Sequence, residues 1–373
     1  MLRMKLVLAA ALAFVPALAA AQETFPSSAG PLRLETVAKG LVHPWALQFL
    51  PDGRMLATER PGRMRIVAKD GALSPPLKGV PEVSAGGQAG LLDVRLDRNY
   101  AQNRTLYFCF NYNRGGAVAV ARAFLNSGAQ PGLEDVSIIF RQKGAGGPDN
   151  VACRIVQATD GNLFVTLGDH FHAAETQKLD NHLGKIIRIT PRGEAPPDNP
   201  FVNKAGALPE IWAYGLRNAE GLAFNPADGK LWEQEHGPMG GDEINIITKG
   251  ANYGWGVVSF GVNYDGTPVG AGKRHAAGMT DPVWHWTPSI APSGMAFVTG
   301  DLFRGWTGSL VNGALKFKLI SRLTLDGDKA VKEERLLEKL NERIRDVREG
   351  ADGALYLLTD NKDGRILRLT PEK

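Results

Sequence analysis

One pattern recurs six times along this 373-residue chain: an apolar strand, a turn, and a second apolar strand. The clearest copy starts with WALQFL, turns at Pro-Asp-Gly and continues with RMLATE. The copies cover residues 45–67, 90–110, 154–169, 221–235, 294–318 and 345–370. Their turns are roughly 45 to 75 residues apart, which is typical of a β-propeller blade with several strands.

We therefore predict an all-β fold, a six-bladed β-propeller with loop insertions at one rim. The 44 Gly and 23 Pro residues also favour many short strands over helices. A two-domain sandwich is the alternative, but it does not explain the recurrence. The long insertions at residues 170–184 and 258–292 are expected at one rim, where they would shape a site.

The first 21 residues have the features of a secretory signal peptide. A basic start with Arg3 and Lys5 precedes an apolar run and a small-residue cleavage region at residues 17–21. A membrane anchor would need about 20 apolar residues, and this run is shorter and contains Pro16. We expect a leader at residues 1–21, a linker at 22–30, one propeller domain at 31–373 and an exported protein, periplasmic in a Gram-negative host.

The charge of the chain argues against a nucleic-acid partner, and its cysteine content excludes a four-thiolate metal site. The leader removes two positive charges and no negative ones, so the formal net charge falls from +4 to +2. This is no electrostatic footprint for nucleic acid, and no basic run supports one. Two cysteines, Cys109 and Cys153, cannot make a four-thiolate metal site. A disulfide and two buried thiols both remain open.

The segment at residues 217–255 contains more than a propeller needs. Adjacent carboxylates, Asp242 and Glu243, follow a Gly-Pro-Met-Gly-Gly loop. Hard cations take carboxylates together with main-chain carbonyls, and Gly and Pro let a loop turn its carbonyls to one point. The sequence thus indicates a calcium site, with an ordinary solvated loop as the alternative.

Several short motifs resemble one enzyme family when taken together and in order. They are GGQAGLLDV (86–94), LGDH (167–170), HLGKIIRI (182–189), YGLRNAEGLAF (214–224), EHGPMGGDEINII (235–247), GANYGW (250–255), PSIAPSG (288–294), ALKF (314–317) and RIRDV (343–347). The chain resembles the soluble PQQ-dependent aldose and glucose dehydrogenases, which are calcium-binding six-bladed propellers. The resemblance extends from about residue 37 to residue 371.

The resemblance implies a site for PQQ, a tricyclic quinone with three carboxylates. Lys316, Arg343 and Arg345 match the residues that bind these carboxylates. The two arginines alternate along one strand, so their side chains should share a face. The remaining cofactor-binding positions are Arg217 and Asn218, beside the reactive carbonyl, and Gln88 near the same atoms.

The same resemblance implies two calcium ions. The carbonyls of Gly237 and Pro238 match the ligands of the ion that touches PQQ. Asp242, Glu243 and the carbonyl of Tyr253 match a second, structural ion. The family's further acidic ligand falls at Asn263, which departs from the pattern but can still offer a carbonyl oxygen.

A larger departure concerns the catalytic base. The family has a His four residues before the arginine that matches Arg154, and this chain has Asn150 there. Asn cannot accept a proton at neutral pH, whereas the adjacent Asp149 can, as a weaker base than His. The loop residues His170 and His172 are further candidates. The predicted catalytic residues are Asp149, Asn150 and Arg217.

These features predict an enzyme that oxidises an aldose at its anomeric carbon to a lactone, with PQQ and calcium as cofactors and an unknown electron acceptor. One rival is a calcium-dependent propeller lactonase or other hydrolase, which has no use for Lys316, Arg343 and Arg345 in one site. The other is a propeller that binds PQQ or a sugar without catalysis, as the missing His suggests. No membrane span is expected in the mature chain.

Overall fold

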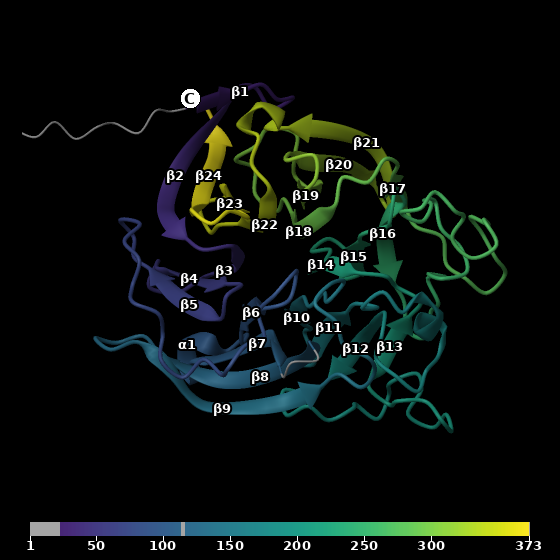
Figure 1. The fold of residues 1–373 in the computed structure, drawn as a ribbon. Helices are drawn as coiled ribbons and strands as arrows, with labels where there is room; N and C mark the ends of the chain where they lie inside the picture. Colours follow the sequence, from purple (N-terminus) through teal and green to yellow (C-terminus); the bar gives the residue numbers. More distant parts are fainter. Residues whose placement is uncertain (1–22, 113–115, 373) are drawn as a thin grey trace, which may run out of the picture.

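The computed structural model describes residues 23–112 and 116–372, which form six antiparallel sheets around one axis (Figure 1). The predicted leader, residues 1–21, lies outside the described residues. We number the sheets as blades 1 to 6. Blade 1 contains β3 (Pro44–Phe49), β4 (Met55–Glu59) and β5 (Arg63–Val67); blade 2 contains β6 (Leu91–Leu96), β7 (Thr105–Tyr112), β8 (Ala117–Asn126) and β9 (Gly132–Arg141); blade 3 contains β10 (Ile155–Gln157), β11 (Leu163–Leu167), β12 (Lys185–Ile189) and β13 (Ile211–Tyr214).

Blade 4 contains β14 (Ala219–Phe224), β15 (Leu231–Glu235), β16 (Asp242–Ile247) and β17 (Trp284–Trp286); blade 5 contains β18 (Pro292–Phe297), β19 (Leu310–Ala314), β20 (Ile320–Asp326) and β21 (Lys329–Leu336); blade 6 contains β22 (Ile344–Glu349), β23 (Leu355–Thr359), β24 (Gly364–Pro371), β2 (Leu32–Leu41) and β1 (Glu23–Phe25). The helical elements in the described ranges are short: α1 (Tyr100–Asn103), and the 3-10 turns η1 (Ala173–Gln177) and η2 (Glu338–Leu340).

The predicted six-bladed propeller is confirmed. Each of the six recurring segments supplies the first two strands of one blade. The outer strands β9, β13, β17 and β21 were not assigned from the sequence. They lie at the blade edges and are less regular in their apolar pattern; β21, for example, is largely exposed.

Four blades join their first two strands by the same Asp-Gly turn. The Asp Oδ1 accepts a hydrogen bond of 2.9 to 3.3 Å from the main-chain N–H two residues later, and the next residue is a Gly with a φ of 74° to 88°. The pairs are Asp52-Gly53, Asp160-Gly161, Asp228-Gly229 and Asp352-Gly353. A side chain at the second position would strain this left-handed backbone, so the repeated dipeptide sets the hairpin.

The ring is closed by pairing between the two ends of the described chain. β2 pairs with β24 from Leu32↔Pro371 to Leu41↔Gly364, which makes an N-terminal strand part of the last blade. β1 then pairs with β2, and Phe25 is buried. Part of the predicted linker at residues 22–30 is therefore a strand, because the free edge of β2 offers it main-chain hydrogen bonds.

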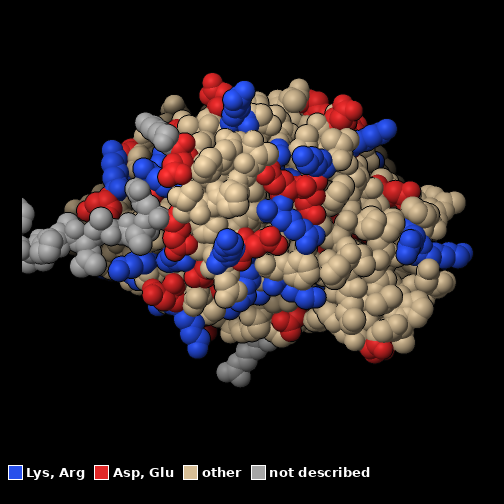
Figure 2. Space-filling model, turned by 90° about the horizontal axis from the view of Figure 1, so that it is seen from above, with Lys and Arg blue, Asp and Glu red and all other residues tan. Residues whose placement is uncertain are grey.

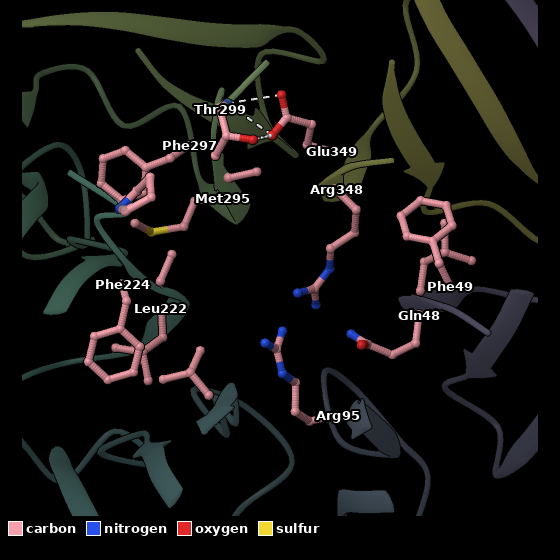
Figure 3. Close-up of a pocket in the computed structure, with 15 residues that line it drawn as sticks. Gln48, Phe49, Arg95, Leu222, Phe224, Met295, Phe297, Thr299, Arg348 and Glu349 are labelled. Atoms are coloured by element: carbon pink, nitrogen blue, oxygen red, sulfur yellow. Dashed lines mark hydrogen bonds between the residues drawn. The ribbon is translucent and has the colours of Figure 1, made fainter. Parts of the chain in front are cut away.

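The first strands of the blades, β3, β6, β10, β14, β18 and β22, stand side by side around the axis. A cavity of about 360 Å³ is lined by the C-terminal parts of these strands, and Phe49, Arg95, Phe224 and Arg348 are among its residues (Figure 3). All six strands therefore finish at one end of the axis, which we name end B. They begin at the opposite end, end A.

Between the two ends lies a buried group of charges, the Arg154 cluster, made of Arg154, Asp93, Asp346, Arg348 and Trp45. The Nη1 atom of Arg154 is 3.2 Å from Asp93 Oδ1 and 3.1 Å from Asp346 Oδ1. Its guanidinium lies 4.2 Å from the centre of the Trp45 ring, which adds a cation–π contact. Side chains of blades 1, 2, 3 and 6 thus meet at one arginine.

The other two blades reach the same cluster through their backbones. Arg154 Nε donates to the Glu220 carbonyl of blade 4 at 3.1 Å. In blade 5, a Cβ added to Gly294 would lie 2.2 Å from Asp346 Oδ1, so only glycine fits there. Every blade therefore contacts the Arg154 cluster, which explains how six separate sheets keep one common geometry.

A disulfide joins blades 2 and 3. Cys109 of β7 is bonded to Cys153, with Cα atoms 6.5 Å apart, in the usual range for such a bond. The sequence left this bond open. It fixes the segment just before β10, immediately beside Arg154.

The surface carries both signs of charge. In the edge view of Figure 2, Lys and Arg side chains are interspersed with Asp and Glu, and no large area of one sign is visible. Within the described ranges, the structure has no helix that is long and apolar enough to cross a membrane.

Replacement of Arg154 by Ala should destabilise the fold strongly. The change leaves Asp93 and Asp346 buried with fewer partners, and loss of one member of a buried ion pair costs about 3–5 kcal/mol. Urea unfolding of wild type and Arg154→Ala measures the difference. The exposed Arg192→Ala is the control and should change the free energy of unfolding by less than about 0.5 kcal/mol. Equal unfolding midpoints for the two variants would show that the cluster is dispensable.

Candidate functional site

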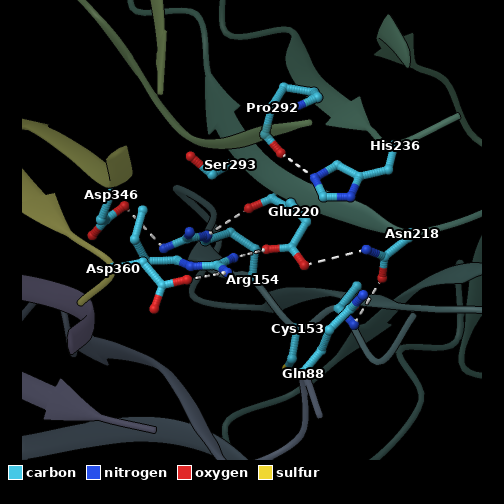
Figure 4. Close-up of polar contacts among 12 residues, drawn as sticks. Gln88, Cys153, Arg154, Asn218, Glu220, His236, Pro292, Ser293, Asp346 and Asp360 are labelled. Carbon is cyan, nitrogen blue, oxygen red and sulfur yellow. Dashed lines mark hydrogen bonds and ion pairs between the residues drawn. The ribbon is translucent and has the colours of Figure 1, made fainter. Parts of the chain in front are cut away.

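End A carries a cluster of guanidinium and carboxylate groups (Figure 4). The buried Arg345 lies 2.8 Å from Glu220 Oε2 and 3.3 Å from Asp360 Oδ2, and Arg343 lies 3.1 Å from the same Asp360 oxygen. The two arginines thus share a face, as predicted. Burial acts in the opposite direction, but Arg345, His43 and Arg343 hold the pKa of Asp360 well below its usual range. This carboxyl stays ionised.

Two further cations stand beside this cluster. Lys316 is exposed and follows Leu315, whose carbonyl accepts a 3.2 Å hydrogen bond from Arg343. Arg60, which the sequence analysis missed, is half-buried, and burial lowers its pKa although the charge of Asp360 acts in the opposite direction. The Arg60 guanidinium makes no hydrogen bond or ion pair with any residue of the described ranges. The end of β4 gave no sequence signal that it would face blade 6.

The buried Asn218 connects blade 3 to blade 4. Its Nδ2 donates to Glu220 Oε1 at 3.2 Å, and its Oδ1 accepts a 3.1 Å hydrogen bond from the Ala152 amide. Both ends of the amide group are therefore used by the protein. Asn218 is well placed at end A, but its contacts here are to neighbouring residues.

Arg217 lies in a box of aromatic rings. Its Nη1 donates to the carbonyls of His236 and Gly237, both at 3.1 Å. Its guanidinium carbon is 5.3 Å from the Trp255 ring centre, and 5.8 and 5.9 Å from those of Phe171 and Tyr264. Phe171 and Tyr264 come from the two predicted rim insertions and are 57% and 64% exposed. Exposed rings around a fixed cation make a surface for a flat or sugar-like ligand.

Asn150 is buried and held by three groups. Its main-chain N–H donates to Gln88 Oε1 at 3.0 Å, and its Nδ2 donates to Asp169 Oδ1 at 2.9 Å. Asp169 also accepts a 2.7 Å hydrogen bond at Oδ2 from Trp255 Nε1. A Cβ added to Gly168 would lie 1.8 Å from the Asn150 carbonyl, so the two segments need this glycine. The LGDH motif contained Asp169, but its role was not predicted.

The candidates for the catalytic base differ in burial and in the hydrogen bonds that their side chains make with the protein. Asp149 is half-buried, and its side chain makes no hydrogen bond with any described residue. His170 is buried, with Nδ1 3.1 Å from the Gly147 carbonyl and Nε2 3.1 Å from Gln142 Oε1, and burial lowers its pKa. Both ring nitrogens of His170 are therefore engaged by the protein. His172 is exposed on the same loop.

Asp242, which was predicted as a calcium ligand, accepts hydrogen bonds from protein groups at both carboxylate oxygens. Its Oδ1 accepts a 2.8 Å hydrogen bond from the Gly237 amide. Its Oδ2 accepts hydrogen bonds from Ser289 Oγ and from the amides of Ile290 and Ala291, at 2.9, 2.7 and 2.9 Å. This buried carboxylate is occupied by protein donors, so it braces two loops. Adjacent carboxylates in a strand point to opposite faces, which separates it from Glu243.

Glu243 lies on an acidic face of blade 4. It is paired across the strands with Glu235, and Glu233 and Asn245 form the next pair on the same face. Burial, followed by the charge of a neighbouring Glu, raises the pKa of Glu233 and Glu243 well above the usual value; burial raises that of Glu235 to about 8. The buried Glu233 Oε1 and Asn245 Oδ1 have no hydrogen-bond partner among the described residues. A hard cation suits such a donor set.

The remaining predicted calcium ligands are main-chain carbonyls and one amide. The carbonyls of Pro238 and Tyr253 accept no hydrogen bond from the described residues and remain available. Asn263 closes its own turn through Nδ2, which donates to Thr267 Oγ1 at 3.1 Å and to the Pro268 carbonyl at 3.0 Å, and its Oδ1 accepts no hydrogen bond from the described residues. In the described ranges no three acidic, His or Cys side chains form a metal-ligand group. Calcium would therefore need carbonyl ligands and water here.

Comparison with known proteins identifies the relatives of this chain. A family profile described as Glucose / Sorbosone dehydrogenase matches residues 41–368. The chain is 42% identical over 348 residues to the aldose sugar dehydrogenase YliI of Escherichia coli strain K12, covering 91% of this chain and 93% of that protein.

Two solved structures of aldose sugar dehydrogenases are similar to this chain over most of its length. The apo form of the soluble aldose sugar dehydrogenase from Escherichia coli matches with a TM-score of 0.88 at 42% identity, over 91% of this chain and all of that one. The PQQ-bound form of the aldose sugar dehydrogenase from Streptomyces coelicolor matches with a TM-score of 0.77 at 29% identity, over 91% of this chain and 98% of that one.

Calcium should stabilise the protein, and more so at high pH. The carboxyls of Glu233, Glu235 and Glu243 have folded-state pKa values raised above those of the unfolded chain, so without calcium stability falls as pH rises from about 4.5 to about 8. Calcium competes with these protons. A ligand at a hundredfold excess over its Kd adds about 2.7 kcal/mol. We expect a clear rise in Tm with calcium against chelator at pH 8, and a smaller rise at pH 5.5.

The variant Glu233→Gln tests the location of this effect. It should reduce the response to calcium, whereas Glu134→Gln, on an exposed part of β9, should not. Equal melting temperatures with calcium and with chelator at both pH values would exclude a calcium site that stabilises the fold.

Proposed function

The chain belongs to the glucose / sorbosone dehydrogenase family, and we propose that it is a PQQ- and calcium-dependent enzyme that oxidises an aldose at the anomeric carbon to the lactone. The observation that carries this proposal is the concentration of cations and exposed aromatic rings at end A. The PQQ-bound relative from Streptomyces coelicolor supports the choice of cofactor.

The cations at end A suit a ligand with three carboxylates. Arg60 has no partner among the described residues, Lys316 is exposed, and Arg343 is 43% exposed although it contacts Asp360. These three groups would bind the carboxylates. Each guanidinium can donate two parallel hydrogen bonds to one carboxylate, and the Lys316 ammonium adds a positive charge. The buried Arg345 is shared by Glu220 and Asp360, so its part is to hold the cluster in place.

Arg217 would stabilise negative charge that develops on the cofactor oxygen. Its position is fixed by two carbonyls and three aromatic rings, so little reorganisation is needed during the reaction. Phe171 and Tyr264, which are exposed around it, would contact the sugar or the cofactor ring and exclude water.

When bound, PQQ supplies a quinone that accepts two electrons as a hydride. The aldose then loses this hydride from its anomeric carbon and a proton from its anomeric hydroxyl, and a carbonyl forms to give the lactone. Asp149 would accept the proton. Asp169 also lies beside Asn150, but its two oxygens already accept hydrogen bonds from Asn150, Phe171 and Trp255.

Calcium would be held by the Pro238 carbonyl, which is free among the described residues, and by the Gly237 carbonyl, which also accepts a hydrogen bond from Arg217, and, at a second position, by Glu243 with the Tyr253 carbonyl. The partnerless oxygens of Glu233 and Asn245 support a cation beside Glu243. A cation at this face would also offset the repulsion among the three glutamates.

A non-catalytic, PQQ-binding propeller is the second candidate. The observation that favours it is Asn150, whose side chain donates to Asp169 where the family's base stands. A hydrolase is favoured by no observation at end A, because hydrolysis needs no cluster of cations for a tricarboxylate.

We also infer that the protein is exported. The leader motif supports this, and the Cys109–Cys153 bond is of the kind that persists in oxidising compartments. The electron acceptor is not indicated by any residue at end A.

PQQ affinity should fall in Arg60→Gln and Arg343→Gln, because each change removes a cation that has no full set of protein partners. A charge-assisted hydrogen bond contributes about 1.5–3 kcal/mol, so we expect at least a tenfold weaker Kd by optical titration with calcium present. Both variants should unfold like wild type. Arg345→Ala should instead lower stability, because it removes the buried cation that Glu220 and Asp360 share. Unchanged affinity in both Gln variants would remove this cluster from the cofactor site.

Catalysis should respond to residues 149 and 150 in opposite directions. In protein reconstituted with PQQ and calcium, the wild type should turn over aldoses slowly. Asn150→His should raise kcat, up to about a hundredfold, because a positioned general base is worth about a hundred- to ten-thousandfold. Asp149→Asn should abolish the remaining turnover while PQQ still binds.

The matched control is Asp326→Asn, on the exposed end of β20, which should leave turnover unchanged. Wild-type turnover as fast as that of Asn150→His, with Asp149→Asn also unaffected, would place the base elsewhere. PQQ binding without turnover in any variant would favour the non-catalytic propeller.

A further inference from the structure

The cavity at end B is a second concave site, separate from end A. Its volume of about 360 Å³ lies at the small end of the range for small-molecule sites. Residues at its wall come from the C-terminal parts of the first strands, whereas Arg217, Arg343 and Arg345 of end A precede or begin first strands. The Arg154 cluster lies between the two.

Two guanidinium groups point into this cavity together with one amide (Figure 3). Arg348 of β22 is held from behind, with its Nε 2.8 Å from Asp346 Oδ2 and its Nη2 3.2 Å from Asp93 Oδ1. Arg95 of β6 is half-buried and makes no side-chain hydrogen bond or ion pair with another residue in the described ranges. Gln48 completes the polar wall.

The cations around the cavity are not all paired. The two buried carboxylates, Asp93 and Asp346, form ion pairs with Arg154 and Arg348, whereas Arg95 forms none with the described residues. Glu349 also lines the cavity, but its carboxylate accepts hydrogen bonds from the amides of Thr299 and Gly300. Burial, followed by repulsion from Arg348, lowers the pKa of Arg95, which agrees with a cation that lacks a counter-charge.

The opposite wall of the cavity is apolar. Leu222, Phe224, Met295 and Phe297 are among its lining residues, and in Figure 3 their strands lie across the cavity from the two arginines. Inorganic anions gain nothing from such a wall, and a polyhydroxylated sugar acid would lose hydrogen bonds to water against it. The site therefore suits an anion with an apolar body.

We propose that the cavity at end B binds a small organic monocarboxylate with an aromatic or branched aliphatic body. The carboxylate pairs with Arg95 and receives further hydrogen bonds from Gln48 and Arg348, while the apolar body packs on Phe224 and Met295. This site is independent of the oxidation proposed for end A.

Calorimetric titration with phenylacetate tests the proposal, with phenylacetamide as the uncharged analogue and sulfate as the inorganic anion. We expect phenylacetate to bind the wild type with one molecule per chain, and the other two probes at least tenfold more weakly. Arg95→Met should weaken phenylacetate at least tenfold. It should unfold at the same temperature as wild type or higher, because the change removes repulsion between Arg95 and Arg348.

Two matched variants locate the binding. Arg98→Met changes a nearby arginine outside the cavity and should leave the affinity unchanged. Arg343→Gln removes a cation at end A and should also have no effect. Loss of binding in Arg343→Gln but not in Arg95→Met would place the probe at end A and overturn the proposal. It would equally fail if phenylacetate does not bind, or if sulfate binds as tightly as phenylacetate.

Discussion

The buried ion pairs of Arg154 are the interaction on which the rest of this propeller depends. Neighbouring blades otherwise meet mainly through their first strands. In the described part of the chain, the disulfide between blades 2 and 3 is the one covalent cross-link between side chains. Buried charges are expensive unless both partners are present, so the cluster penalises any blade that shifts. A fixed axis then gives both of its ends a fixed shape. The cations at end A and those at end B can therefore hold different ligands without sharing one cavity.

Much of the fold could be predicted from the sequence because it is encoded locally. The Asp-Gly turns and the apolar runs on either side repeat within short segments, and six of them give the number of blades. The closure by β2 left no such signal, since Leu32–Leu41 pairs with Gly364–Pro371 and neither segment has a turn that points to the other. The strand β1 was taken for a linker for the same reason: its partner edge exists only after the ring has closed.

The candidate site was predictable where a motif carried it and not where packing assembled it. Arg343 and Arg345 do share a face, and Arg217 and Asn218 do lie at end A. Arg60 and Asp360 were missed because they follow the second strands of blades 1 and 6, and only the folded ring brings them beside Arg343 and Arg345. The hydrogen bonds that Asp242 and Asn263 make with neighbouring residues were not predicted, because a sequence does not reveal which groups will meet a carboxylate or an amide.

The pairing of β2 with β24 has a consequence for how the protein is made. Blade 6 needs a strand from near the start of the chain and three from its end, so no ribosome can complete the ring before it has reached residue 371. Blades 1 to 5 can form hairpins earlier, but their first strands have an unfinished neighbour until then. Until β24 has folded, β2 presents an unpaired edge, and a second unfolded chain could fill it. Domain-swapped oligomers are thus an assembly error that this closure permits.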